Sequence, residues 1–268
     1  MAKVEKKLWR IAGLPAVAAL FATAPERVER LFFDDRLKAQ AGAFSAVLAK
    51  ARKPYRLVEA EELARVAGSA MHGGIVAIAQ PLAVADFDLA EAKRWAKDGQ
   101  PLLILDGVSN PQNLGAIART AAYFGLLRMV LSDHPSQAAP SDAAYRIAEG
   151  GLDYIKLYRA TGLPAMLKRL RDFYLVVGTA LGAGKQLSAL HSGKRPIAII
   201  LGNEEHGLSS TTLKACEAVV ILPGTGRVQS LNVSASAAIF IHAVMGHGEA
   251  SDGAKLPNRQ PAMTKHRG

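Results

Sequence analysis

The sequence predicts an α/β protein whose larger part is a mostly parallel sheet covered by helices on both faces. Aliphatic runs typical of buried strands recur through the second half of the 268-residue chain, and segments with helical spacing separate them. Half of the residues are hydrophobic, which is typical of a globular protein. Glycine- and asparagine-rich strings follow three of the aliphatic runs, at the strand ends where such sheets form ligand crevices. These runs are Pro101–Asp106, Ile197–Leu201 and Ala218–Leu222.

Residues 1–81 predict a small α/β domain at the N-terminus. Segments whose apolar residues have helical spacing alternate with segments that look extended, as in strands. Helical spacing covers Val17–Phe21, Phe44–Ala51 and Glu59–Val66, whereas extended runs cover Val28–Phe33, Tyr55–Val58 and Ile75–Ala79. Residues 82–99 predict a charged linker with one helix, Leu89–Lys97.

Residues 100–248 predict a second domain, because aliphatic strands and helices alternate throughout it. Residues 249–268 are rich in Pro, Gly, Lys and Arg, and they predict a disordered basic tail. We place the strands of the second domain at 102–106, 128–132, 154–157, 174–179, 197–201 and 218–222, and its final helix from Val233 to Gly246.

Charge and composition narrow the function classes. The formal net charge of +10 favours a polyanionic partner, with nucleic acid the leading candidate, although an ordinary basic surface would look similar. No apolar stretch approaches the roughly 20 residues that cross a membrane, and the first residues lack the apolar core of a signal peptide. We therefore expect a cytoplasmic protein. Cys216 is the only cysteine and the histidines show no paired ligand spacing, so we expect no metal.

The first of the three strings, Asn113–Arg119, predicts the start of a helix. Asn113 is a good N-cap, and the helix would run through Phe124 and end at Gly125. Arg119 lies about 140° from the apolar stripe on a helical wheel, so it is not a core residue. Its guanidinium is either a surface charge or a group that binds an anion near the helix start. The stripe itself consists of Leu114, Ile117, Ala118 and Ala121.

The second and third strings combine glycines with polar side chains. Gly202 directly follows a strand, where glycine permits either a close ligand or a turn with positive φ. Glu204, in the same string, could form an ion pair with an arginine in the crevice. In the third string, Pro223–Gly226 predicts a tight loop. Ser230 and Asn232 then either cap the final helix or bind a ligand.

Two nucleotide-binding motifs are excluded. Gly178–Lys185 resembles a P-loop, but five residues separate its outer glycines where four are required. Gln186 also replaces the Ser or Thr that would hold magnesium. Gly224-Thr-Gly226 lacks the third glycine of a dinucleotide fingerprint. A small-molecule enzyme of the Rossmann type therefore has little support.

In their order and spacing, the three strings resemble the SpoU/TrmH branch of the SPOUT methyltransferases, which transfer methyl groups from S-adenosylmethionine to RNA ribose 2′-hydroxyls. The matching motifs are Asn113–Arg119, Gly202–Gly207 and Pro223–Ser234. His72–Gly74 adds a resemblance to the ribosomal-protein-like substrate-binding domain of that family. Ala148–Gly151 resembles a string of an uncharacterised bacterial tRNA/rRNA methyltransferase subgroup. Many other relatives have Ser-x-Gly-Ala at this place, so the resemblance does not determine the exact contacts with the substrate.

The resemblance implies a SPOUT-type parallel-sheet domain with a trefoil knot, S-adenosylmethionine as cofactor, a homodimer, and tRNA or rRNA as substrate. It also implies two groups of site residues. By motif position, the catalytic and substrate-orienting residues are Asn113, Arg119, Glu204, Ser230 and Asn232, and the cofactor-binding residues are Thr179, Ala180, Gly202, Leu222 and Leu231.

The resemblance implies a catalytic role for Arg119. A guanidinium is effectively always protonated, so we expect Arg119 to hold a phosphate and stabilise the developing alkoxide. Glu204 would then set the orientation of the guanidinium. The alternative is a non-catalytic RNA-binding protein that has retained the methyltransferase fold, although the intact polar residues of the three strings disfavour it.

Overall fold

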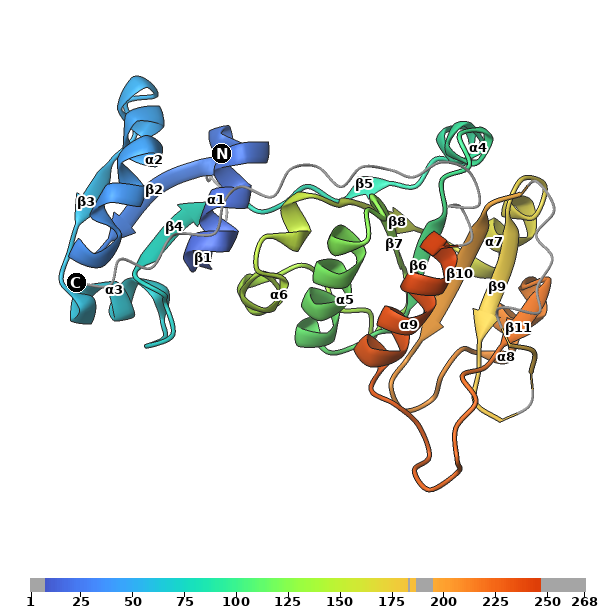
Figure 1. The fold of residues 1–268 in the computed structure, drawn as a ribbon. Coiled ribbons are helices and arrows are strands. Elements are labelled where there is room, and N and C mark those ends of the chain that lie inside the picture. Colours follow the sequence, from blue (N-terminus) through green and yellow to red (C-terminus); the bar gives the residue numbers. More distant parts are fainter. Residues whose placement is uncertain (1–7, 183, 187–194, 247–268) are drawn as a thin grey trace.

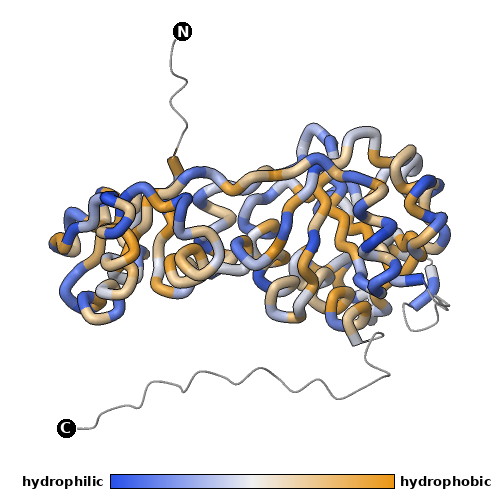
Figure 2. The backbone as a smooth tube through the Cα atoms, turned by 90° about the horizontal axis from the view of Figure 1, so that it is seen from above, coloured by the Kyte–Doolittle hydropathy of each residue, from blue (hydrophilic) through white to orange (hydrophobic). Residues whose placement is uncertain are grey.

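The computed structural model describes residues 8–182, 184–186 and 195–246, in which the chain forms two sheets (Figure 1). The expected basic tail at 249–268 lies outside the described residues. The two sheets lie at opposite ends of an elongated molecule, and hydrophobic segments run through both ends (Figure 2). The predicted α/β fold class is thus confirmed.

The smaller, N-terminal sheet has the strand order β1-β4-β2-β3 and mixes antiparallel with parallel pairs. The extended runs predicted from the sequence became β2, β3 and β4, whereas β1 was missed. Arg10 interrupts the apolar character of β1, which therefore has no clear strand pattern. The elements of this unit are β1 (Trp9–Ala12), α1 (Leu14–Thr23), η1 (Pro25–Arg27), β2 (Val28–Phe33), η2 (Asp35–Leu37), α2 (Lys38–Lys50), β3 (Tyr55–Leu57), α3 (Ala60–Ala67) and β4 (Ile75–Ala79).

The larger sheet has seven strands in the order β11-β9-β10-β6-β7-β8-β5, and every pair in it is parallel. Its elements are β5 (Ala85–Asp86), α4 (Leu89–Lys97), β6 (Leu102–Asp106), α5 (Pro111–Tyr123), β7 (Arg128–Ser132), α6 (Asp142–Ala148), η3 (Gly151–Asp153), β8 (Lys156–Ala160), α7 (Leu163–Leu170), β9 (Leu175–Thr179), β10 (Ile197–Gly202), α8 (Ser210–Ala215), β11 (Ala218–Val220) and α9 (Val233–Gly246).

Among the strands of this sheet, β8 and β5 differ most from the sequence prediction. Strand β8 begins at Lys156, later than expected, because Gly151–Asp153 form a 3-10 helix before it. Residues 82–99 contain the expected helix, α4, but they also supply β5, which extends the sheet beside β8. A strand of only two residues is too short to leave a pattern in the sequence.

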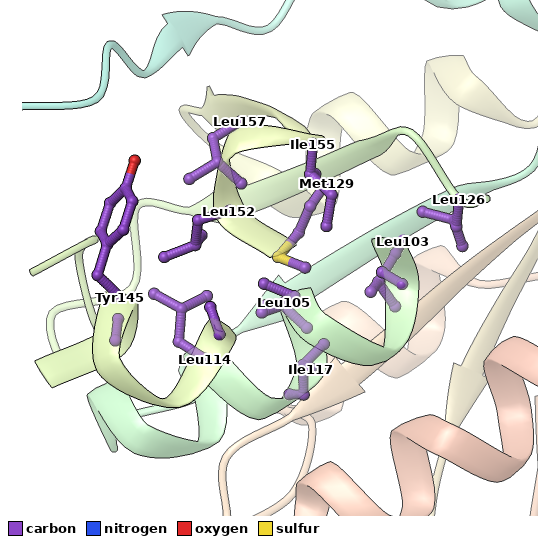
Figure 3. Close-up of a cluster of buried hydrophobic side chains, with 14 of the residues drawn as sticks. Leu103, Leu105, Leu114, Ile117, Leu126, Met129, Tyr145, Leu152, Ile155 and Leu157 are labelled. Carbon is purple, nitrogen blue, oxygen red and sulfur yellow. The ribbon is translucent and has the colours of Figure 1, made fainter. Parts of the chain in front are cut away.

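Helices cover both faces of the larger sheet because its strands alternate their side chains between two cores. Leu103 and Leu105 of β6 join the cluster that includes α5, α6 and α9 (Figure 3). Leu102 and Ile104, on the opposite face, join the cluster that includes α4, α7 and α8. The first cluster continues into the N-terminal unit, so the two units share buried side chains.

Candidate active site

The first two polar strings meet because their strands are neighbours. Strands β6 and β10 pair in parallel, with Asp106 level with Gly202, so the loops that follow them leave the sheet side by side. Gly202 packs against its own loop: a Cβ there would lie 2.4 Å from the carbonyl carbon of Gly207. The first glycine of the second string therefore permits a tight turn, and the positive φ of this string falls on Gly207, at 66°.

Glu204 is the centre of the polar network at this edge. Its carboxylate accepts hydrogen bonds from the backbone N–H of Ser109 at 3.0 Å and of Asn110 at 3.2 Å. The Ser109 hydroxyl donates to it at 3.0 Å, and the Asn113 side-chain amide donates at 2.9 Å. Burial alone would raise the pKa of Glu204, but these hydrogen bonds outweigh it, so the pKa lies below its usual value. Glu204 is therefore held as a carboxylate.

Asn113 joins Glu204 to the third string. Its side-chain oxygen accepts a hydrogen bond from the Asn232 side-chain amide at 3.2 Å. The Asn232 oxygen in turn accepts from the backbone N–H of Ser234 at 2.8 Å, in the first turn of α9. Asn232 thus caps this helix, as one of the two alternatives from the sequence predicts, and it also bonds to Asn113; that it binds a ligand stays a prediction.

Asn113 is not the N-cap that its position in the string predicts. Asn110 caps α5 by accepting from the backbone N–H of Gln112 at 2.8 Å, and Pro111 takes the first helical position, where its missing N–H costs nothing. The helix therefore starts earlier than expected. The Asn113 side chain is released from capping and bonds to the two other strings.

Gly115, in the same string, allows two helices to approach closely. A Cβ at this position would lie 2.3 Å from the carbonyl oxygen of Ala144 in α6. The glycine is thus required by the close packing of α5 on α6.

Arg119 does not pair with Glu204, and that prediction was wrong. Six residues of helix place Arg119 about 9 Å along α5 from Asn113 and about 120° around it. Its guanidinium instead pairs with the carboxylate of Glu149, with Nη2 and Oε2 2.9 Å apart. Both side chains are about half exposed, at 56% and 49%. Arg119 is therefore free of the core, as the helical wheel predicts.

The remaining residues singled out from the sequence lie around the loop between β11 and α9, which extends beyond the sheet (Figure 1). Leu222 packs against the core, whereas Ser230 and Leu231 are exposed. Within the described part of the chain, residues 222–231 make no backbone–backbone hydrogen bond.

Thr179 and Ala180 end the strand beside this loop. The Thr179 hydroxyl donates to the carbonyl of Ile200 at 2.9 Å, and the Ala180 N–H donates to the carbonyl of Val220 at 3.0 Å. These bonds hold the ends of β9, β10 and β11 together.

Sequence reasoning missed two residues. Ser109 holds Glu204 with both its backbone N–H and its hydroxyl. The sequence feature that could have pointed to it is the polar turn that follows the first strand. Glu149 pairs with Arg119, and the only sequence feature that pointed to it is its position in the string Ala148–Gly151.

Among the residues that the structure describes, no three His, Cys, Asp or Glu side chains form a metal-binding cluster, and none of the helices has an apolar stretch of membrane-spanning length.

Comparison with known families agrees with this arrangement. The model of the SpoU rRNA Methylase family matches residues 100–242, and a model described as RNA 2′-O ribose methyltransferase substrate binding matches residues 10–85. The chain is 31% identical over 240 residues to the 23S rRNA (guanosine-2′-O-)-methyltransferase RlmB of Acinetobacter baylyi, which covers 86% of this chain and 94% of that protein. It is also 36% identical to an uncharacterised tRNA/rRNA methyltransferase of Haemophilus influenzae, over 60% of this chain and 45% of that one.

Solved structures share the fold. An rRNA methyltransferase from Sinorhizobium meliloti matches with a TM-score of 0.74 and 20% identity, over 91% of this chain and 88% of that one. The SpoU methyltransferase AviRb from Streptomyces viridochromogenes, solved in complex with the cofactor AdoMet, matches with a TM-score of 0.72 and 18% identity, over 91% and 92% of the two chains.

Proposed function

The chain belongs to the SpoU rRNA Methylase family, and we propose that it transfers a methyl group from S-adenosylmethionine to a ribose 2′-hydroxyl of RNA. The family models confirm the resemblance seen in the three strings. The observation that carries the proposal is the hydrogen-bonded chain Asn232–Asn113–Glu204, which joins all three strings at one edge of the sheet.

The open loop supports the cofactor assignment. When bound, S-adenosylmethionine would supply a methyl group on a positively charged sulfur. The ribose 2′-oxygen would bond to that methyl carbon as the carbon–sulfur bond breaks, S-adenosylhomocysteine would leave, and the hydroxyl proton would pass to solvent. Backbone groups can bind the adenine edge and the amino acid part of such a molecule, and residues 222–231 make no backbone–backbone hydrogen bond to the other residues that the structure describes. We assign Leu222 and Leu231 to the cofactor pocket, together with Thr179, Ala180 and Gly202.

The charged residues of the site have separate roles in this proposal. Glu204 accepts four hydrogen bonds and its pKa is lowered, so it is a poor proton acceptor and instead holds Asn113 and the start of α5 in place. Arg119 binds the phosphate next to the target ribose and stabilises the developing charge on the sugar oxygen. Ser230 lies on the open loop and orients the substrate.

RNA is the substrate class, and the N-terminal unit is the second contact with it. The substrate-binding model covers this unit, and the net charge of +10 favours a polyanion. Relatives that match over most of their length are named as 23S rRNA methyltransferases, so ribosomal RNA is the first substrate to test, with tRNA as the alternative. We place the reaction in the cytoplasm, where such RNA is available.

We also propose a homodimer. Three large apolar side chains lie exposed at the end of α5, in the segment that follows it and on α9, which suits an interface between copies of the chain: Tyr123, Leu127 and Ile239. The trefoil knot expected for the C-terminal domain stays a prediction, as do the domain boundaries at residues 81, 99 and 248. Light scattering after size-exclusion chromatography tests the dimer.

The decisive experiment compares ribose methylation in RNA from cells with and without this protein. A ribose that loses its 2′-O-methyl group in the absence of the protein identifies the substrate. Calorimetry with S-adenosylmethionine separates the alternative of a non-catalytic RNA-binding protein, which would show no heat. Absence of both methylation and cofactor binding would reject the enzymatic proposal.

A further inference from the structure

The turn Glu149–Asp153 connects the two units of the molecule. Gly150 packs against α1, where a Cβ would lie 2.7 Å from the Cβ of Ala19. Asp153 forms an ion pair with Arg27, with Nη1 and Oδ1 2.8 Å apart and side chains only 0% and 12% exposed. The Tyr145 hydroxyl donates to the same carboxylate at 3.0 Å. The turn is therefore held against the N-terminal unit by close packing and by a buried charge pair.

The same turn also contacts Arg119. A Cβ at Gly151 would lie 2.7 Å from the Arg119 Cα, so the backbone of the turn lies directly on α5 at this residue. Glu149 then reaches the guanidinium, with Oε2 and Nη2 2.9 Å apart. Both the backbone and the head group of Arg119 are thus in contact with one short turn.

Stability does not explain the pair between Glu149 and Arg119. Both side chains are about half exposed, and exposed pairs of this kind contribute little to folding. Glu149 has φ 44°, a left-handed conformation that favours glycine over any residue with a Cβ. A side chain here is unfavourable for the backbone, so its carboxylate is best explained by what it does to Arg119.

We propose that Glu149 is a positioning residue, whose carboxylate holds the Arg119 guanidinium in the place where it meets the RNA phosphate. The turn sets that place relative to the N-terminal unit, so the RNA held by that unit and the arginine are brought into register. This inference rests on the function proposed above, in which Arg119 acts on the RNA.

Three variants of the full-length protein test it: Glu149→Gln, Glu149→Gly and Glu149→Asp. The assay measures kcat and KM with 23S rRNA from cells that lack the protein, alongside the affinity for S-adenosylmethionine and thermal unfolding. We expect Glu149→Gln to lower kcat by about tenfold to a hundredfold, because Arg119 loses its orientation, with KM and cofactor affinity unchanged. Glu149→Asp should retain part of kcat, because the carboxylate remains.

Glu149→Gly separates positioning from folding. Glycine suits the left-handed backbone, so this variant should unfold at the same temperature as the original protein or higher, and yet lose kcat like Glu149→Gln. The control is Glu91→Gln on α4, which removes an exposed pair of the same kind, with Arg94 at 3.5 Å, and should leave all four quantities unchanged.

Two results would overturn the inference. One is an unchanged kcat in both Glu149→Gln and Glu149→Gly. The other is a lower KM for RNA with kcat unchanged or raised, which would mean that the carboxylate competes with the RNA phosphate for Arg119. Failure of the proposed function would look different, because the original protein itself would then show neither methyl transfer to the RNA nor binding of S-adenosylmethionine.

Discussion

The Asn232 side-chain amide donates a hydrogen bond to the Asn113 side-chain oxygen at 3.2 Å, across 119 positions of sequence. This bond connects the string that precedes α9 to the helix that follows the first strand of the site. Asn113 passes the connection on to Glu204, since its own amide donates to that carboxylate. The three strings are thereby held together by side chains that each have a partner in another string.

Removing Asn113 should therefore loosen all three loops. Asn113 is buried, and in Asn113→Ala both Glu204 and Asn232 lose a partner, so we expect the free energy of unfolding to fall by about 1–3 kcal/mol. Methyl transfer should fall further than stability alone explains. Urea unfolding and a radiolabelled methyl-transfer assay measure the two effects. The exposed neighbour Gln112→Ala is the control, and equal behaviour of the two variants would contradict the role of the network.

Arg119→Ala should nearly abolish methyl transfer and leave the affinity for S-adenosylmethionine close to normal. The reason is that Arg119 lies on the side of α5 away from the core and binds RNA rather than cofactor in our proposal. Calorimetry and the methyl-transfer assay separate the two quantities. Arg94→Ala, which removes an exposed arginine from α4, should change neither. Unchanged turnover in Arg119→Ala would reject the role given to this residue.

Acid should weaken the contribution of Glu204 to stability. Because the pKa of Glu204 is lowered in the folded protein from 4.5, its contribution is present above that value and is lost as the pH falls through the folded pKa. The difference in unfolding free energy between the original protein and Glu204→Gln should thus be larger at neutral pH than in strong acid. Urea unfolding across this range measures it. Glu205→Gln, in the same turn but 84% exposed, is the matched control, and a difference that stays constant for Glu204→Gln would argue against the prediction.

The buried pair of Arg27 and Asp153 should respond differently to single and double substitution. Arg27→Met leaves a buried carboxylate unpaired, which should cost about 3–5 kcal/mol. Burial already raises the pKa of Asp153, with Arg27 opposing this, so the loss should shrink as the pH falls and the carboxyl takes up a proton. The double variant Arg27→Met with Asp153→Leu should recover much of the stability, because no charge is then left in the interface. Thermal and urea unfolding of the three proteins check this, and a double variant less stable than Arg27→Met would contradict it.

Local patterns predicted well wherever the chain is continuously apolar. Strands β6 and β7 were placed at their observed bounds, because a buried parallel strand is aliphatic on both faces and therefore stands out. Strands β1 and β5 lack such a run, so they were missed. The cap of α5 was misplaced because Asn110 and Asn113 are both good caps, and only the helix start at Pro111 distinguishes them.

The sequence by itself determined the α/β class, the aliphatic strands and the chemical types of the site residues, since these depend on local composition and spacing. The tertiary structure alone decided which polar groups meet. Glu204 bonds to Ser109 and Asn113 instead of Arg119, and Arg119 pairs with Glu149. The physical reason is that these pairings depend on strand order and on the rotation of α5 about its axis, and both are set by packing between segments far apart in the chain.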